Sequence, residues 1–448
     1  MVVPNSKPDN LADLVFNKLK PEVTGGIKPN KTVLRSLMEI MFYASLKTEE
    51  GQLLNVTVTL IDHELSYPLK KKSSDAWNFV KLENRQPFQV KTLVKLAKAA
   101  DPWSGSIAVY YDSDEQLWIN GMIDQTVHNQ SYLNYETDRR PLQPGILQVS
   151  IIGIGALSVF SGYEEIGTLK QDNLIKGYVD VLDRGPVSAS LKSRTTKLKT
   201  ELTKYVRSID AEKSIKLDTM VKTCVKMVFS RILIQIQKYH HGGSILFTSG
   251  SRNLDIKYKI SYDRLHRAML NYLKNKIDER VYNFELLDEP NMEPQTIEQY
   301  KRQVEIHSQK IKANNELKGT IRFIASQSCV DGLVLIDDHL CIKGFGTVIK
   351  KIMLPDRVWQ CSNVYANEDD FEDSDPENHG TRHRSIFSHC WNTPGSLGFV
   401  VSQDGDVRAI LRIGDKLIMW ENIKAKQTRD SQNVDHGTIN SERKSRSV

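Results

Sequence analysis

The chain has 448 residues, of which 40% are hydrophobic and 26% charged, and its formal net charge is +6. This length predicts two or three domains, and the composition is ordinary for a soluble globular protein. The basic bias is mild and suits anionic ligands, but no interleaving of basic and aromatic residues and no helix-turn-helix pattern favours nucleic acid as a partner.

The cysteines and the apolar stretches exclude two further classes. The five cysteines are scattered, odd in number and without CxxC spacing, which argues against a disulfide framework and against a zinc site. The N-terminus lacks a signal-peptide pattern. The most apolar stretch, Gly145–Gly162, is interrupted by Gln148, Ser150 and Ser158 and is too polar to span a membrane. We therefore expect a cytoplasmic protein without a membrane segment.

Residues 1–184 are expected to form a strand-rich α+β domain with a sensing role. Apolar residues recur at helical spacing over Thr32–Leu46, which predicts an amphipathic helix. Three later stretches alternate apolar and polar residues, as antiparallel strands do: Leu53–Asp62, Ser106–Asp124 and Gly145–Phe160. No constellation in this part of the sequence indicates catalysis, so we expect it to regulate rather than react.

Residues 185–290 are expected to form a middle region of helices and strands. A long helix with a broad apolar face is predicted over Ser214–Tyr239 and ends at His240-His241-Gly242-Gly243. Histidines and glycines there are typical of a helix C-terminus, because cationic side chains favour the negative end of the helix dipole and glycine ends the helix. The alternative, a metal or phosphate site, stays open. A strand over Leu254–Tyr262 and a helix over Asp263–Asn283 follow.

A proline-containing acidic stretch, Asn283–Pro294, is the expected boundary before a third domain over residues 291–423. A helix is predicted from Pro294 past Ala313, and it either packs on its own domain or pairs with another copy of the chain. Within Asn367–Glu377 seven of eleven residues are acidic, which favours a solvated, mobile loop over a gate beside a phosphate site. Residues 424–448 are polar, without periodicity, and are expected to be disordered.

Two short stretches of the third domain carry chemistry. Val330–Gly346 is predicted to be a strand, a tight turn and a second strand, entered through Asp331 and Gly332. A carboxylate at that position suits a hard cation, and glycine lets a ligand approach the backbone. The second stretch, Thr381–Arg384, concentrates side chains that donate hydrogen bonds, and arginine matches the geometry of phosphate oxygens. A carboxylate for a metal and a basic cluster for phosphate are what nucleotidyl transfer needs.

These stretches resemble the diadenylate cyclase family. The DGA and RHR motifs of that family reappear as Asp331-Gly332-Leu333 and Arg382-His383-Arg384. Their flanks agree as well, in the segments CVDGLVLIDDHLCIKGFG, GTRHRSIF and GFVVSQDGDVRAI, which follow in order across about residues 317–420. The family joins two ATP molecules into cyclic di-AMP, with a divalent metal and two catalytic domains placed face to face.

The resemblance implies a fold, partners and roles for residues. It implies an α/β (α+β) chain whose C-terminal mixed sheet is flanked by helices, working as a homodimer or higher homo-oligomer on ATP with Mg²⁺ or Mn²⁺. Asp331 would bind the metal or the ribose 3′-hydroxyl group, and the Thr381–Arg384 cluster would clasp the phosphates. The implied catalytic residues are Asp331, Arg382, His383 and Arg384, and the implied nucleotide-binding residues are Gly332, Leu333, Gly380, Thr381, Ser402 and Gln403.

The sequence departs from the family pattern at two positions. Leu333 stands where the motif has alanine, and its extra bulk is expected beside the nucleotide. Gln403 stands where many members have an acidic residue that assists the metal. The alternative to a cyclase is therefore a catalytically weak or inactive nucleotide-binding sensor of the same fold, and the base that the site selects is left open.

Overall fold

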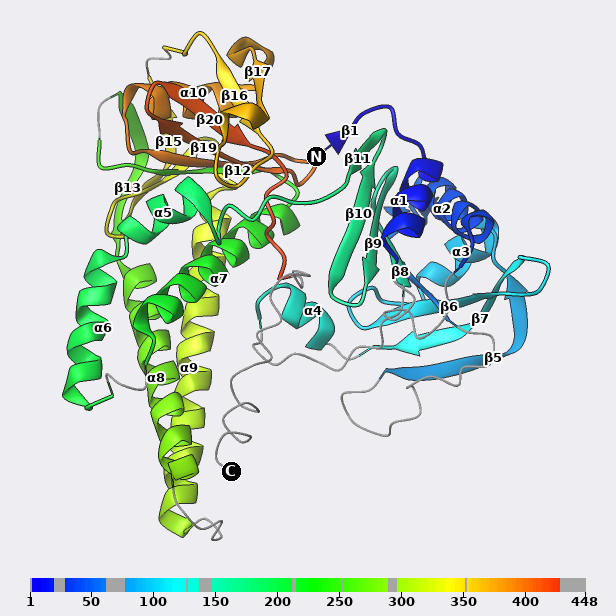
Figure 1. The fold of residues 1–448 in the computed structure, drawn as a ribbon, viewed down its shortest axis with the longest axis horizontal. Helices are drawn as coiled ribbons and strands as arrows, with labels where there is room; N and C mark the ends of the chain where they lie inside the picture. The colour runs from blue at the N-terminus through cyan, green and yellow to red at the C-terminus, as the bar shows by residue number, and fades with distance from the viewer. Residues whose placement is uncertain are drawn as a thin grey trace, which may run out of the picture. The chain divides into compact units, whose positions relative to one another are not determined.

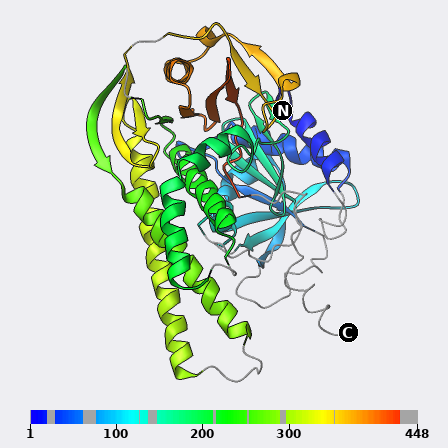
Figure 2. The same ribbon diagram turned by 60° about the vertical axis from the view of Figure 1, so that its left-hand side comes forward.

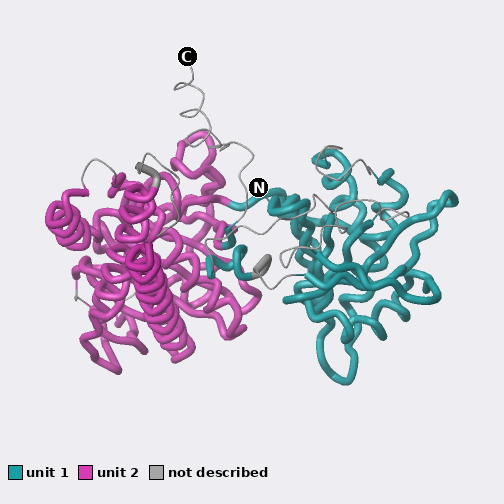
Figure 3. The backbone as a smooth tube through the Cα atoms, turned by 90° about the horizontal axis from the view of Figure 1, so that it is seen from below, with its two compact units in different colours: residues 1–178, 426–448 teal, residues 179–425 magenta. Residues whose placement is uncertain are grey.

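The computed structural model describes residues 2–19, 29–61, 77–125, 128–136, 147–211, 215–250, 253–288, 296–350 and 353–427. The chain divides into two compact units, which are coloured separately in Figure 3. Unit 1 comprises residues 1–178 and 426–448, and unit 2 comprises residues 179–425. The expected α+β class, with a strand-rich N-terminal region and a C-terminal mixed sheet flanked by helices, is confirmed.

The described part of unit 1 is built on a sheet with the strand order β1-β11-β10-β9-β8-β4-β6-β7-β5. Neighbouring strands are antiparallel except for β4 and β6, which are parallel. A small hairpin of β2 (Thr48–Glu49) and β3 (Gln52–Leu53) lies outside this sheet. The strands of the sheet are β1 (Val2–Val3), β4 (Thr57–Leu60), β5 (Asn78–Pro87), β6 (Gly105–Tyr111), β7 (Leu117–Asp124), β8 (Leu147–Gly153), β9 (Ala156–Ser161), β10 (Glu164–Lys170) and β11 (Asn173–Ile175).

Three helices share one hydrophobic core with this sheet: α1 (Pro8–Lys18), α2 (Lys31–Ser45) and α3 (Val90–Ala97). The amphipathic helix predicted from the apolar spacing is α2, and its buried side chains include Leu34, Leu37, Met38 and Met41. Asn30 caps it by accepting a hydrogen bond from the backbone of Val33. A fourth helix, α4 (His128–Leu133), precedes β8 (Figure 1).

Unit 2 is organised around a second sheet, with the strand order β13-β15-β14-β12-β18-β19-β20-β16-β17. The pairs β12–β14 and β16–β20 are parallel and the others are antiparallel, so the sheet is mixed. Its strands are β12 (Gly243–Phe247), β13 (Leu254–Tyr262), β14 (Leu333–Ile336), β15 (Ile342–Ile349), β16 (Val358–Cys361), β17 (Phe371–Ser374), β18 (Leu397–Val401), β19 (Val407–Ile413) and β20 (Lys416–Trp420).

This sheet crosses the boundary that the sequence predicted near residue 290. Strands β12 and β13 come from the middle region, yet β12 lies between β14 and β18 and β13 pairs with β15. The structure therefore places residues 185–290 and 291–423 in one unit, which begins at Val179. Proline and acidic residues mark the connection between two helices, part of which (289–295) lies outside the described residues, and they carry no information about strand pairing.

The helices of unit 2 are α5 (Gly185–Ser193), α6 (Thr196–Ser208), α7 (Leu217–Lys238), α8 (Arg264–Asp288), α9 (Ile297–Gln327) and α10 (Thr381–Asn392). Helices α8 and α9 run side by side in Figures 1 and 2 and are joined by the Lys310–Glu279 ion pair. Ala313, Leu317 and Ile321 in the second half of α9 are buried. The helix predicted from Pro294 thus packs on its own unit. Helix α10 buries Ile386 and Phe387 in a core that it shares with the sheet.

The acidic segment at residues 367–377 has regular structure, so the prediction of a loop is wrong. It contains a 3₁₀ turn (Glu368–Asp370), strand β17 and the start of a second 3₁₀ turn (Pro376–Asn378). Basic side chains from neighbouring segments offset its charge through the pairs Lys416–Glu368, Arg357–Asp373 and Arg384–Glu377. A count of acidic residues in the sequence does not show which basic side chains neutralise them in the fold.

The ends of the described chain bear on two further expectations. The backbone N–H of Lys424 donates to the carbonyl oxygen of Val179 at 3.0 Å, and Ala425 is buried. The prediction of a disordered tail from residue 424 is therefore wrong for its first residues, and residues 428–448 lie outside the described residues. Among the described helices, even the long α7 and α9 do not combine the length and apolar character that a membrane span requires.

Candidate functional site

Several of the predicted site residues lie at one edge of the unit 2 sheet, where three strand ends meet. Strands β12 and β14 are parallel, with Ile245 opposite Val334, so their N-terminal ends lie next to each other. Strand β18 is antiparallel to β12, with Val401 opposite Gly243, so its C-terminal end lies at the same edge. This register brings the approaches to the three strands together at Asp331–Gly332, His241–Gly242 and Ser402–Gln403, which we call the motif edge.

Arg382 joins the motif edge from the start of α10. Its Nη1 atom donates a long hydrogen bond of 3.5 Å to the carbonyl oxygen of His241. A Cβ atom placed on Gly242 would lie 3.0 Å from Arg382 Nη1 and 3.2 Å from the backbone nitrogen of Gln403. Arg382, Gly242 and Gln403 are therefore immediate neighbours, although more than 100 residues separate the first two in sequence.

Asp331 is exposed at the entry to β14. The following glycine has φ +114°, and a Cβ atom there would lie 2.5 Å from the carbonyl carbon of Gly346. Gly332 is thus required where β14 approaches β15, because any other side chain would collide with that strand. The close approach that the sequence predicted for this glycine is made to the protein's own backbone.

Leu333 lies in the hydrophobic core of unit 2 with Leu335, Ile386 and Phe387. Its bulk is therefore buried in the core, and its place beside a nucleotide stays a prediction. Alternate side chains of a strand share a face, and Leu333 and Leu335 both contribute to the core that α10 covers. The departure from the DGA motif is accommodated by packing.

Helix α10 presents its N-terminus at Thr381, with Gly380 in the N-cap position. Glycine has no side chain to satisfy the first backbone N–H groups of the helix, and Thr381 is exposed. Free N–H groups and the positive end of the helix dipole favour an anion at this point. Gly380 and Thr381 form this helix end, and phosphate binding by them stays a prediction.

His383 is the buried member of the RHR triplet, with 8% of its surface exposed. Its Nε2 atom lies 3.1 Å from Nη1 of Arg408, and Arg408 Nε donates to Glu421 Oε1 at 2.7 Å. Burial, followed by the charge of Arg408, lowers the pKa of His383 to about 4. The imidazole is neutral at pH 7, so it adds no positive charge for phosphates.

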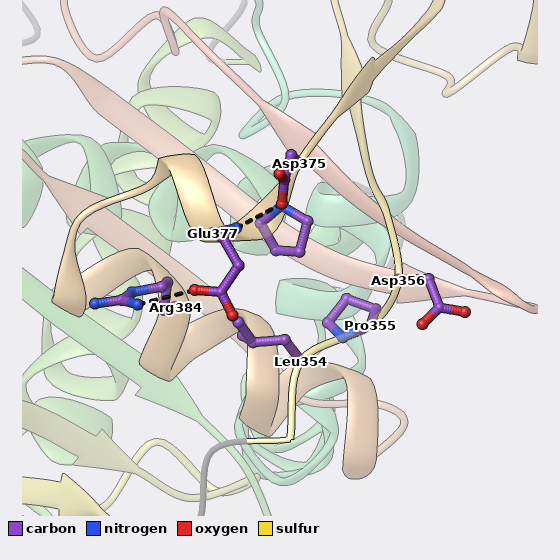
Figure 4. Close-up of a pocket in the computed structure, with 7 residues that line it drawn as sticks. Leu354, Pro355, Asp356, Asp375, Glu377 and Arg384 are labelled. Atoms are coloured by element: carbon purple, nitrogen blue, oxygen red, sulfur yellow. Dashed lines mark hydrogen bonds and ion pairs between the residues drawn. The ribbon is translucent and has the colours of Figure 1, made fainter.

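Arg384 points away from the motif edge. Residues two positions apart on an α-helix project about 200° apart, so the backbone of α10 directs Arg382 and Arg384 to different sides of the helix. Arg384 Nη1 pairs with Glu377 Oε2 at 3.0 Å, as the dashed line in Figure 4 shows. The pair lines a surface pocket of about 590 Å³, whose other lining residues are Leu354, Pro355, Asp356, Asp375 and Pro376.

This pocket carries three carboxylates against one guanidinium, which is unfavourable for a triphosphate. Asp331 and Arg382 are not among its lining residues. The structure therefore divides the predicted quartet: Thr381 and Arg382 are available at the start of α10, His383 is buried, and Arg384 is engaged by Glu377.

Ser402 and Gln403 form the start of the turn between β18 and β19. The Ser402 hydroxyl accepts a hydrogen bond from the backbone of Asp406 at 2.9 Å, and the Ser402 carbonyl accepts one from Gly405 at 3.1 Å. Ser402 therefore stabilises the turn. Gln403 is exposed beside Gly242 and is the one of the two whose side chain is directed to solvent.

The motif edge offers a single carboxylate at Asp331. Within the ranges that the structure describes, no three His, Cys, Asp or Glu residues are grouped so that they would hold a metal ion. Mg²⁺ is commonly held by one or two carboxylates together with the phosphates of a substrate. The exposed carboxylate of Asp331 is a ligand of the type that such an ion accepts.

The sequence did not identify Gly242, Arg408 and Glu421 as part of the site. The sequence did give a hint for Gly242, because a metal or phosphate site was left open as an alternative interpretation of the His240–Gly243 segment. The structure confirms the preferred interpretation, because α7 ends at Lys238 and the backbone turns through positive φ at His240 and Gly242. It also places this helix end against Arg382. Nothing local marks Arg408 or Glu421.

Comparison with known proteins gives one match. Residues 26–124, within unit 1, match the family model described as "Probable sensor domain DACNV", the N-terminal sensor domain of diadenylate cyclases. No model of a diadenylate cyclase catalytic domain matches the chain. No curated protein matches it. No solved structure matches it either. The match indicates a sensor domain in unit 1, and the matched residues include none of the motif residues.

Proposed function

We propose that this protein is a diadenylate cyclase, in which unit 2 condenses two ATP molecules into cyclic di-AMP and unit 1 regulates that reaction as a sensor. The observation that carries the proposal is the convergence of the DGA segment, Arg382 and the Ser402–Gln403 turn on one sheet edge. The sensor-domain match in unit 1 supports it independently.

The proposed reaction forms two phosphodiester bonds. The 3′-hydroxyl oxygen of each ATP attacks the α-phosphorus of the other, pyrophosphate leaves in line, and the hydroxyl proton is released. Two ATP molecules thus give one cyclic di-AMP and two pyrophosphates. Positioning of the two nucleotides and stabilisation of charge on the transferring phosphoryl group supply most of the rate in such reactions.

Asp331 and the RHR residues have separate parts in this proposal. Asp331 lies next to the attacking hydroxyl group, and it would hold a Mg²⁺ or Mn²⁺ ion that would supply charge neutralisation. Arg382 and the N-terminus of α10 bind the phosphates. His383 stays neutral beneath them. Arg384 contributes to phosphate binding only after it is released from Glu377.

Two copies of the chain are needed for the product. One copy presents one Asp331 and one α10 N-terminus, whereas the cyclic product requires two attacks on two α-phosphorus atoms. A cytoplasmic homodimer with its motif edges face to face supplies both halves, which also makes the interface between copies part of the reacting site.

The experiment is to incubate the full chain with ATP and Mn²⁺ or Mg²⁺ and to measure cyclic di-AMP by mass spectrometry. Asp331→Asn should abolish the product without changing the unfolding midpoint, because Asp331 is exposed and outside the core. A normal rate in this variant would remove Asp331 from the mechanism.

The second candidate is an inactive nucleotide-binding sensor of the same fold. The ion pair between Arg384 and Glu377 favours this candidate, because it neutralises one of the arginines that would bind phosphate. ATP binding by calorimetry without cyclic di-AMP would select this candidate. Absence of both binding and product would overturn the nucleotide site itself.

A further inference from the structure

A row of three hydrogen-bonded side chains lies under the start of α10. Glu421 Oε1 accepts from Arg408 Nε at 2.7 Å, and Arg408 Nη1 lies 3.1 Å from His383 Nε2. Arg408 is on β19, and Glu421 directly follows β20, its neighbour in the sheet. The side chains of Arg408 and Glu421 are 23% and 28% exposed, so the row is largely shielded from water.

The chemistry of guanidinium decides which hydrogen His383 carries. All polar atoms of an arginine side chain are donors, so Nη1 of Arg408 can only donate to His383. The Nε2 atom must therefore offer its lone pair, which places the single ring proton on Nδ1. The groups that face the ring support a neutral form: Arg408 and Arg382 are cations, and His379 lies 5.7 Å away between ring centres.

Packing fixes the plane of the same ring. The ring centre of Phe387, one turn along α10, lies 6.1 Å from that of His383 and 5.1 Å from that of His379. His379 is itself held through the hydrogen bond between its Nε2 and Ser374 Oγ, at 2.9 Å. The ring is thus held on one side by Arg408 and on another by this aromatic group.

We propose that Arg408 and Glu421 are positioning residues that hold His383 as a neutral Nδ1–H donor beside the phosphate end of the site. Glu421 fixes the guanidinium, and the guanidinium fixes the tautomer and orientation of His383. The histidine of the RHR motif then offers phosphate a hydrogen bond and no charge, which leaves Arg382 and the helix N-terminus as the positive groups. The identity of the ligand rests on the proposed function, whereas the tautomer does not.

The test is a ¹⁵N spectrum of the histidine rings in the full chain, which distinguishes Nδ1–H, Nε2–H and imidazolium forms. The His383 signals are assigned from their loss in His383→Gln. The wild type should show the Nδ1–H tautomer from pH 6 to pH 8. In Arg408→Met the ring should exchange between tautomers and become protonated at higher pH, because a donor and a neighbouring cation are removed. Arg408→Lys, which keeps a donor and the charge, should restore part of the wild-type spectrum.

Arg412→Met is the matched control, since Arg412 is on the same strand and donates to the carbonyl oxygens of Gly414 and Trp391. It should leave the His383 spectrum unchanged. An Nε2–H tautomer in the wild type, or a wild-type spectrum in Arg408→Met, would overturn the proposal.

Activity provides a second and separable readout. Removing a side chain that orients a functional group commonly costs about 10- to 100-fold. Arg408→Met should therefore lower kcat for cyclic di-AMP formation by that factor, with a smaller change in KM and partial recovery in Arg408→Lys. If the wild type forms no cyclic di-AMP, the proposed function fails and the ¹⁵N spectra still decide the tautomer. Unchanged kcat in Arg408→Met, with product formed, would overturn the positioning role alone.

Discussion

The guanidinium of Arg382 lies on the backbone at Gly242. Its Nη1 atom is 3.5 Å from the carbonyl oxygen of His241. A Cβ atom at position 242 would lie 3.0 Å from the same Nη1 atom. Gly242 also has φ +69°, a conformation that other residues rarely adopt. The end of helix α7 is thus shaped to receive the first arginine of the RHR motif.

Gly242→Ala should weaken ATP binding. The added methyl group would meet the carbonyl oxygen of Val401 at 2.9 Å and displace Arg382, besides a backbone cost of about 1–2 kcal/mol. We expect calorimetry to show a loss of ATP affinity of about 10-fold. A loss of this size corresponds to one hydrogen bond to a charged group. Gly414→Ala is the control, because Gly414 has φ +59° and open space around it. Equal ATP affinity in the two variants would contradict the role of Gly242.

Glu377→Gln should strengthen ATP binding. The substitution frees Arg384, two residues from Arg382, and removes the negative charge that now pairs with it. Because both side chains are substantially exposed, the pair is worth only about 0.2–1 kcal/mol, so the gain is at most about fivefold. Glu372→Gln, in the same acidic segment, tests for a general charge effect. Weaker binding in Glu377→Gln than in this control would show that the ion pair supports the site.

Leu333→Ala should destabilise unit 2 without opening the site. It restores the alanine of the DGA motif, but it also removes a buried side chain from the core. Such truncations cost about 2–5 kcal/mol, which chemical denaturation followed by circular dichroism would detect. Unchanged stability together with faster cyclic di-AMP formation would mean that this side chain faces the nucleotide.

Stability should fall as the pH falls below about 6.5, because His383 is held neutral. Its pKa is about 4 in the folded chain and near 6.5 when unfolded, so the unfolded state binds more protons between these values. The contribution is fully present above pH 6.5 and is lost towards pH 4. Between pH 7.5 and 5.5 the loss from His383 is about 1 kcal/mol.

Urea denaturation at the two pH values measures this loss. His379 and His389, whose pKa values burial also lowers, add to it in the same direction. His383→Gln should show a correspondingly smaller loss between pH 7.5 and 5.5. An identical pH dependence in the wild type and in this variant would show that His383 is not held neutral by the fold.

The rate of cyclic di-AMP formation should depend on protein concentration more steeply than first order. One copy of the chain supplies one Asp331 and one Arg382, so dilution below the dimer dissociation constant removes the complete site. Specific activity measured over a dilution series, with the mass measured by light scattering at each concentration, tests this. Constant specific activity in samples that are shown to be monomeric would exclude the face-to-face arrangement.

The sequence by itself predicted the features that depend on near neighbours in the chain. Helical apolar spacing identified α2 and α7, alternation identified strands such as β13, and paired histidines and glycines identified the end of α7. The two motifs, in their order along the chain, also named Asp331 and Arg382 as partners. These signals survive in the sequence because each is set by backbone geometry or chemistry within a few residues.

Only the tertiary structure decided which residues meet. Strand β12 enters the sheet between strands that follow it by about 90 and 150 residues, and this pairing turned two predicted domains into one unit. Burial of His383, engagement of Arg384 by Glu377 and the place of Leu333 in the core were likewise absent from any local pattern. Each depends on packing and charge supplied by distant segments, and a pattern that spans only a few positions carries no record of those contacts.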